Sequence, residues 1–178
     1  MNELDVLTAT RNWVESFVIG LNLCPFAKKE FVQDRIRFVV TEADSALDLV
    51  VDLKKELERL KADSSLETTL LIHPSVLIDF GDYNQFLNQV DELLVSLDLE
   101  GVFQVASFHP DYQFAGTGQE DPENYTNRSP YPTLHLLREE SLEKAIEHYP
   151  DIDQIPMRNI KLMNEMGVES IRALLRDL

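Results

Sequence analysis

The chain has 178 residues, of which 44% are hydrophobic and 27% charged, and this favours one compact domain over residues 1–178. The 32 Asp and Glu residues outnumber the 16 Lys and Arg residues, which gives a net charge of −16 at pH 7. Because nucleic acids and anionic lipids carry the same sign of charge, general binding to nucleic acid or to a membrane is excluded. The sequence shows no export signal and no membrane-spanning run, and its lone cysteine, Cys24, cannot form an internal disulfide, so we expect a cytoplasmic protein.

The charge is distributed unevenly along the chain. No Lys or Arg occurs in the 66 residues between Lys61 and Arg128, although this segment holds 12 acidic residues. Arg128, which ends the segment, is therefore the first cation to consider as a binding group for an anion.

Apolar periodicity predicts a helix, a strand and a second helix in the first third of the chain. Residues 6–21 repeat with helical spacing before a stop at Asn22 and Pro25. A strand is predicted over 35–40, and residues 41–44 resemble a capping box that opens the next helix. The apolar face of that helix is predicted to contain Leu47, Val50, Leu53, Leu57 and Leu60.

The alternation of strands and helices continues and then breaks. A strand is predicted over 68–73, a helix over 82–98 and a third strand over 102–108. Residues 109–132 contain prolines, glycines and aromatic residues but no apolar periodicity, which favours a packed functional loop over a solvated linker. A fourth strand is predicted over 133–138.

Three helices are predicted in the C-terminal part of the chain. Ser141 caps the first of them, and the last two meet at Gly167. Successive strand–helix–strand units predict right-handed crossovers with parallel pairing of the first three strands, and we expect the fourth strand to be antiparallel. The predicted fold class is α+β or α/β, with a single mixed four-stranded sheet, two parallel βαβ crossovers and flanking helices.

Two of the predicted strands end in a His-Pro pair, at His73 and at His109. Both histidines are expected at the carboxyl edge of the sheet, where open α/β sheets bind their ligands. His109 begins the long loop, so it is a candidate catalytic acid or base, oriented by Asp111 or Asp121. The alternative is a structural histidine whose ring nitrogens bond to the loop backbone, and for His73 a structural role is favoured.

A metal site is a second possibility at this edge. His109, His135 and Asp121 together would suit zinc, iron or manganese, although no short histidine spacing supports the site. The alternative for His135 is a half-buried, hydrogen-bonded residue within the fourth strand.

The loop also supplies candidate groups for binding a substrate anion. Arg128 and Arg138 could clamp a carboxylate or phosphate, with Asn127 and Ser129 as hydrogen-bonding partners. Alternatively, the arginines neutralise nearby acidic residues, and Asn127 and Ser129 form turns.

Cys24 has three interpretations. As a nucleophile it would need a basic partner that lowers its pKa, and as a sulfur ligand it could bind haem or a metal together with a histidine. The third interpretation is a buried packing residue, because Cys24 is flanked by the apolar residues Leu23 and Phe26.

Several segments of the chain also resemble a known family. These are residues 22–26, Phe108-His109-Pro110 with Tyr112 and Phe114, residues 127–132 and residues 135–138. Together they resemble the bacterial family called domain of unknown function 1415, over nearly the whole chain. The resemblance implies a small stand-alone bacterial protein but no catalytic residue, cofactor or partner, because no activity is established for that family.

The residues therefore predict a small cytoplasmic enzyme that acts on a small anionic substrate by hydrolysis or group transfer, with or without a divalent metal. One alternative is a non-catalytic module that binds haem or a metal through Cys24 and a histidine. The other is an adaptor whose acidic surface binds a basic protein partner. The sequence does not indicate an oligomeric state.

Overall fold

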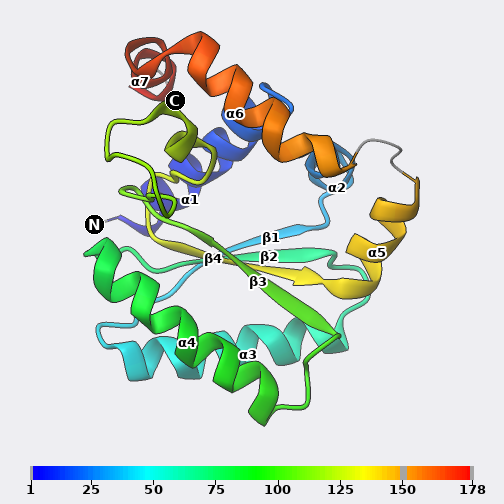
Figure 1. Cartoon of the computed structure of the whole chain (residues 1–178). Coiled ribbons are helices and arrows are strands. Elements are labelled where there is room, and N and C mark those ends of the chain that lie inside the picture. The colour runs from blue at the N-terminus through cyan, green and yellow to red at the C-terminus, as the bar shows by residue number, and fades with distance from the viewer. Residues whose placement is uncertain (1, 149–151, 177–178) are drawn as a thin grey trace.

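Four strands form one open sheet in the computed structural model, which describes residues 2–148 and 152–176 (Figure 1). The strands are β1 (Ile36–Val40), β2 (Thr68–Ile72), β3 (Phe103–Phe108) and β4 (Thr133–Arg138), and their order across the sheet is β1-β2-β4-β3. β1 pairs with β2 in parallel, whereas β4 is antiparallel to both of its neighbours. The predicted α+β class, the mixed sheet and the antiparallel fourth strand are confirmed.

The position of β4 corrects one detail of the predicted pairing. β2 and β3 run in the same direction, but they do not pair with each other because β4 lies between them. Leu134 and Leu136 of β4 are fully buried. A strand with this degree of burial suits the centre of the sheet, where both of its backbone edges are paired.

Helices cover both faces of the sheet (Figure 1). α3 (Ala46–Ala62) and α4 (Phe80–Ser96) pack on one face. The other face is covered by α1 (Glu3–Asn12), the π-helix η1 (Trp13–Ile19), α6 (Ile155–Met166) and α7 (Val168–Arg176). The shorter elements are α2 (Ala27–Val32), the 3₁₀-helices η2 (Pro122–Thr126) and η3 (Ile152–Gln154), and α5 (Glu139–His148). None of the described helices is long and apolar enough to cross a membrane.

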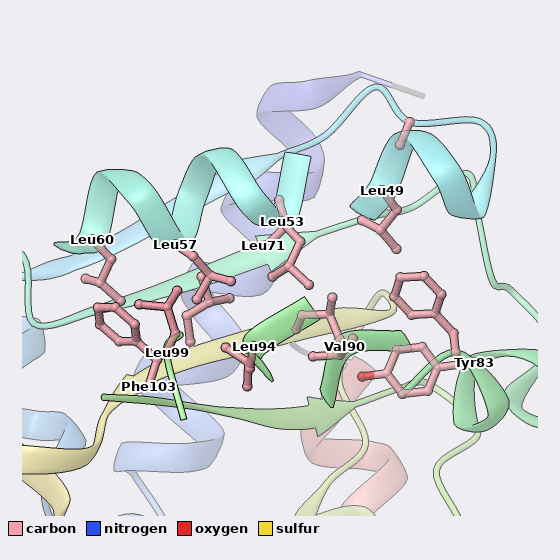
Figure 2. Close-up of a cluster of buried hydrophobic side chains, with 14 of the residues drawn as sticks. Leu49, Leu53, Leu57, Leu60, Leu71, Tyr83, Val90, Leu94, Leu99 and Phe103 are labelled. Atoms are coloured by element: carbon pink, nitrogen blue, oxygen red, sulfur yellow. The ribbon is translucent and has the colours of Figure 1, made fainter. Parts of the chain in front are cut away.

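The larger group of buried side chains lies between the sheet and the α3–α4 layer (Figure 2). Leu53, Leu57 and Leu60 of α3 are spaced by three or four residues, so they share the helix face that contacts the sheet. Residues of α4 and of the strands complete this core, among them Val90, Leu94, Leu71 and Phe103.

The start of α3 differs from the prediction. The helix is capped by Ser45, whose Oγ accepts a hydrogen bond from the backbone N of Asp48 at 3.2 Å, and not by residues 41–44. Leu49 lies four residues before Leu53 and so shares the buried face, whereas Leu47 lies about 120° around the helix from Leu53 and is 73% exposed, so the predicted inward position of Leu47 is wrong. The hydroxyl of Thr41 instead holds the preceding turn, where it accepts from the backbone N of Ala43 at 3.0 Å.

A second group of buried side chains joins the two ends of the chain. Trp13 and Phe17 of η1 pack with Met163 of α6 and Ile171 of α7 against the other face of the sheet. The predicted first helix is therefore two elements, α1 and η1. The predicted break between the last two helices is confirmed at Gly167, whose φ of 74° lies in the left-handed region that favours glycine.

Candidate functional site

The predicted functional loop, residues 109–132, is packed and held by its own hydrogen bonds. Asn124 is fully buried at its centre. Its Oδ1 accepts from the backbone N of Phe114 at 2.9 Å and from Oγ1 of Thr117 at 2.8 Å, and its Nδ2 donates to the carbonyl of Gly118 at 2.7 Å. These bonds fix the loop as one wall of the site described next.

A pocket of about 460 Å³ lies where this loop meets the first and last helices. The segments that form it lie at the same end of the molecule, although they are far apart in the sequence (Figure 1). Its volume falls in the range of small-molecule sites. The lining residues are Ala9, Trp13, Pro110, Asp111, Gln119, Glu120, Tyr125, Arg128, Ser129, Pro130, Arg172 and Leu175.

Arg128 is the buried cation of the pocket, with 9% of its surface exposed. Its Nε donates to the carbonyl of Tyr112 at 3.1 Å and its Nη2 to the carbonyl of Gln119 at 2.7 Å. The guanidinium lies over the ring of Tyr125, 4.5 Å from the centroid. No carboxylate of the described chain forms an ion pair with Arg128. Because a buried charge is costly without a counter-charge, this arrangement favours an anion in the pocket.

Arg172 of α7 contacts the hydroxyl end of the same tyrosine. Its Nε donates to the hydroxyl oxygen of Tyr125 at 2.9 Å, and its Nη2 forms an ion pair with Glu120 at 2.7 Å. These contacts tie α7 to the loop. They also compensate the charge of Arg172, so the uncompensated cation among the described lining residues is Arg128.

Trp13, the first residue of η1, lines the pocket and is 1% exposed. Its ring packs edge-on against Phe108, with centroids 5.3 Å apart. Among the described residues, its buried Nε1 has no hydrogen-bond partner.

His109 lies at the predicted sheet edge, but it does not line the pocket. Its buried ring packs against α4, 5.4 Å from Phe80 and 5.1 Å from Tyr83 between ring centroids. Its Nε2 donates to the carbonyl of Leu77 at 3.2 Å, and its Nδ1 accepts from the backbone N of Asp111 at 3.0 Å. These bonds select the neutral ring, and burial lowers the pKa of His109 below its usual 6.5. The geometry matches the structural alternative, in which both ring nitrogens bond to the backbone.

The three predicted metal ligands are not brought together. His135 lies opposite Leu70 in the sheet register, on the face covered by α1 and α6, whereas the ring of His109 packs on α4 across the sheet. The carboxylate of Asp121 accepts from the backbone N of Gly118 at 2.7 Å within its own loop. Across residues 2–148 and 152–176, no group of three His, Cys, Asp or Glu side chains could hold a metal ion.

His135 and His73 instead have structural surroundings. Nε2 of His135 lies 2.7 Å from Oγ1 of Thr68, and burial lowers the pKa of this ring to about 4. His73 is fully buried, with its Nδ1 3.0 Å from the carbonyl of Val76, and burial lowers its pKa to about 4 as well. Both rings are therefore neutral at pH 7.

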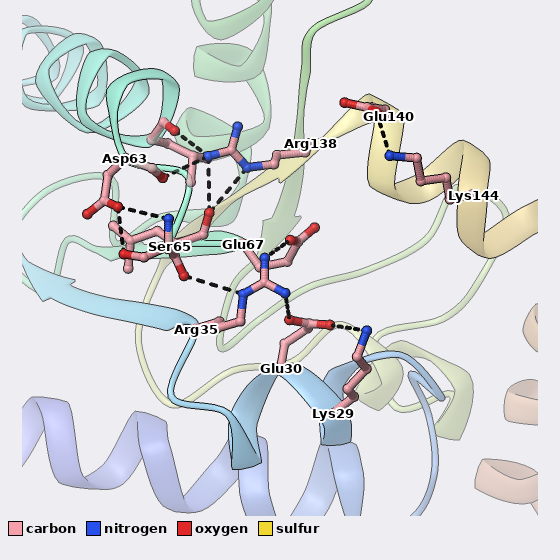
Figure 3. Close-up of polar contacts among 11 residues, drawn as sticks. Lys29, Glu30, Arg35, Asp63, Ser65, Glu67, Arg138, Glu140 and Lys144 are labelled. Carbon is pink, nitrogen blue, oxygen red and sulfur yellow. Dashed lines mark hydrogen bonds and ion pairs between the residues drawn. The ribbon is translucent and has the colours of Figure 1, made fainter.

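Arg138 lies at the far end of β4 (Figure 3). Its guanidinium donates to the backbone carbonyl of Leu60, to that of Asp63 at 3.0 Å and to that of Leu66 at 3.0 and 3.2 Å. It thus binds carbonyls at the C-terminal end of α3 and in the turn that follows. The five residue steps from Thr133 to Arg138 span about 17 Å, and Arg128 lies in the loop before Thr133, so Arg128 and Arg138 do not hold the same small anion.

The remaining predicted loop residues divide between the pocket and the backbone. Asp111 and Ser129 line the pocket, although the hydroxyl of Ser129 donates to the carbonyl of Tyr131 at 2.6 Å. Asn127 donates from Nδ2 to the carbonyl of Ser107 at 3.2 Å, which fastens the loop to the end of β3.

Cys24 lies outside the pocket, between η1 and α2. Burial raises the pKa of its thiol above the usual value. A raised pKa disfavours the thiolate that both nucleophilic attack and metal or haem ligation require.

Trp13, Tyr125 and Arg172 belong to the pocket but are not among the predicted site residues. Trp13 and Arg172 lie on helices near opposite ends of the chain, so their neighbours in the sequence give no indication of the loop that they contact. The signals available were that Trp13 is the single tryptophan and that Arg172 lies on a strongly amphipathic helix.

Comparison with known proteins gives one match. The family model described as "Protein of unknown function (DUF1415)" matches residues 5–173 of the chain. Searches among curated proteins and among solved structures found no match.

Proposed function

Because the chain belongs to DUF1415, a family of unknown function, we propose its function from the pocket alone: it binds a small anionic molecule, a carboxylate or a phosphate, with Arg128 as the anchor. The observation that carries this proposal is a buried guanidinium beside a pocket, without a carboxylate partner in the described chain. An oxyanion in the pocket would supply the missing counter-charge and accept hydrogen bonds from the remaining N–H groups of Arg128.

Hydrolysis or group transfer on this anion would depend on Asp111. It is the predicted catalytic carboxylate that lines the pocket, and within the described residues it forms no ion pair. A carboxylate beside a bound substrate can accept the proton of an attacking water or hydroxyl group. A cytoplasmic location is part of the proposal, and the single free thiol of Cys24 supports it.

The experiment is a titration with inorganic phosphate at low ionic strength, followed by the fluorescence of Trp13, the one tryptophan of the chain. We expect the fluorescence of the wild type to change saturably with phosphate. In Arg128→Gln the apparent affinity for phosphate should fall about tenfold or more, because a charge-assisted hydrogen bond is lost. Asp111→Asn should bind phosphate at least as tightly as the wild type, because it removes a like charge.

Arg59→Gln is the matched control. It removes the same charge from α3, on the other side of the sheet, where the side chain is 57% exposed. If Arg59→Gln and Arg128→Gln weakened phosphate binding equally, the effect would come from net charge in general, and this result would contradict the proposal. The absence of a saturable response to phosphate and to succinate in the wild type would do the same.

A further inference from the structure

Two arginines from distant parts of the chain contact the same tyrosine of the pocket. The guanidinium of Arg128 lies over the face of the Tyr125 ring, 4.5 Å from the centroid, and Nε of Arg172 donates to the hydroxyl oxygen of that ring at 2.9 Å. The centroid and the hydroxyl oxygen of a tyrosine are about 3 Å apart, so Cζ of Arg128 and Nε of Arg172 are separated by at most about 10 Å. Because Tyr125 is buried, its rigid ring fixes this separation.

The counter-charge of Arg172 is exchangeable. Arg172 and Glu120 form their ion pair with 39% and 68% of the side chains exposed, and the carboxylate of Glu169, which is 89% exposed, lies 3.7 Å from the same guanidinium. Ion pairs exposed to this degree contribute little to stability, because water competes for both partners. Glu120 and Arg172 both line the pocket, so a carboxylate of a bound ligand can take the place of Glu120 beside Arg172 at little cost to the fold.

The separation of the two arginines sets the length of a ligand that contacts both. A carboxylate carbon lies about 4 Å from the Cζ of a guanidinium that binds it. Two such contacts joined by the two-carbon spacer of succinate reach about 12 Å when extended, which exceeds the separation of Arg128 and Arg172. A molecule of this size therefore spans the two arginines, and it fits within a pocket of about 460 Å³.

We infer that the pocket binds a short dicarboxylate, with one carboxylate on Arg128 and the other on Arg172, from which it displaces Glu120. This inference rests on the proposed function and narrows its ligand from any small anion to one with two acidic groups. A guanidinium offers five N–H donors, so Arg172 can keep its bond to Tyr125 through Nε and bind the ligand through its terminal nitrogens.

The test compares succinate with succinamate, in which an uncharged amide replaces one carboxylate at nearly the same size. In calorimetric titrations at low ionic strength, the wild type should bind succinate about tenfold more tightly than succinamate, because only succinate pairs with both arginines. In Arg172→Gln the affinity for succinate should fall about tenfold and that for succinamate should stay unchanged, so the preference disappears. A merely structural role of Arg172 would weaken both ligands equally.

Glu120→Gln should change the affinity in the opposite direction. The substitution removes the carboxylate that competes for Arg172, so succinate should bind about threefold more tightly than in the wild type, whereas succinamate should bind as before. Glu123→Gln is the matched control, because it removes the same charge from the same loop at a residue outside the pocket lining. An equal gain in both variants would indicate net charge alone and overturn the displacement of Glu120.

The outcomes distinguish this inference from the proposed function. If the wild type bound succinate no more tightly than succinamate, or if Arg172→Gln weakened both ligands equally, the dicarboxylate would be overturned. The proposed function would still stand if phosphate binding depended on Arg128. A wild type that binds neither phosphate nor succinate would overturn both. If Arg172→Gln fails to fold, the preference of the wild type for succinate and its increase in Glu120→Gln decide the question.

Discussion

Arg128 lies in the loop that leads into β4 and Arg138 is the last residue of that strand, and both donate hydrogen bonds to backbone carbonyls. The guanidinium of Arg138 donates to the carbonyls of residues 60, 63 and 66, and so it caps the C-terminal end of α3 and the turn that follows. At the Arg128 end, two carbonyls use part of the guanidinium, and the residue lines a pocket of about 460 Å³.

The comparison shows that an arginine bound to carbonyls is not by itself a binding site. Arg138 satisfies carbonyls that a helix end would otherwise leave without donors, so its role is explained within the fold. Arg128 adjoins a pocket that also contains the unpartnered indole of Trp13. The two ends of β4 should therefore respond differently to substitution, acid and ligand.

The largest effect is expected at the Arg138 end. Arg138→Ala removes the donors of several carbonyls at once, and we expect the free energy of unfolding to fall by about 3 kcal/mol in urea denaturation. Saturating phosphate should stabilise this variant by the same increment as the wild type, because the pocket is intact. Loss of that increment would show that the two ends of β4 are coupled.

The second-largest effect is expected from acid, which should lower the free energy of unfolding through His73, at the end of the sheet near Arg128. Burial lowers the pKa of His73, at the end of β2, to about 4, whereas the unfolded ring titrates near 6.5. The unfolded chain binds more protons between these values, so this contribution is present above pH 6.5 and is lost as the pH falls toward 4. We expect about 2 kcal/mol less stability at pH 4.5 than at pH 7 from this residue.

Urea denaturation of His73→Gln at both pH values checks this expectation. In this variant the free energy of unfolding should change less between pH 7 and pH 4.5, because the contribution of His73 is absent. The contribution of His135, whose pKa is also about 4, should remain. An unchanged slope between pH 7 and 4.5 would contradict the assignment to His73.

A smaller stability effect is expected for Arg128→Ala. The substitution leaves the carbonyls of Tyr112 and Gln119 without their donor, but it also removes a buried charge, so we expect a loss of about 1 kcal/mol. The stabilisation by saturating phosphate should shrink by about 1.4 kcal/mol or more, which corresponds to a tenfold or larger loss of affinity, in contrast to Arg138→Ala. Thermal unfolding with and without phosphate measures both quantities.

The smallest effect is expected on exposed α5. Lys144→Ala removes an ion pair with Glu140, in which the side chains are 64% and 78% exposed. Water screens such a pair, so the melting temperature and phosphate binding should both stay unchanged. A measurable drop in melting temperature would show that this exposed ion pair stabilises the fold.

Local sequence signals predicted most of the fold. β4 was predicted at 133–138 because polar and apolar residues alternate between Pro132 and the acidic pair that follows Arg138. One boundary failed where two caps compete, at Thr41 and Ser45 before α3. The placement of β4 between β2 and β3 was missed, because pairing partners depend on contacts between distant segments.

The site was predicted only in part. The loop and Arg128 follow from the break in periodicity and from the charge pattern. The choice between a catalytic and a structural His109 depends on the two backbone groups that its ring contacts, and those come from residues 77 and 111. Trp13 and Arg172 reach the pocket only through tertiary packing of the two ends of the chain.

The central position of β4 also orders events during synthesis. β2 and β3 are complete by residue 108, but the strand that separates them ends at residue 138. Until then β3 has no strand to pair with and β2 has one unpaired edge, so the two backbone edges that β4 later pairs stay open to other chains. The last strand made is thus the one that closes the sheet, and a chain that stops before residue 133 should aggregate rather than fold.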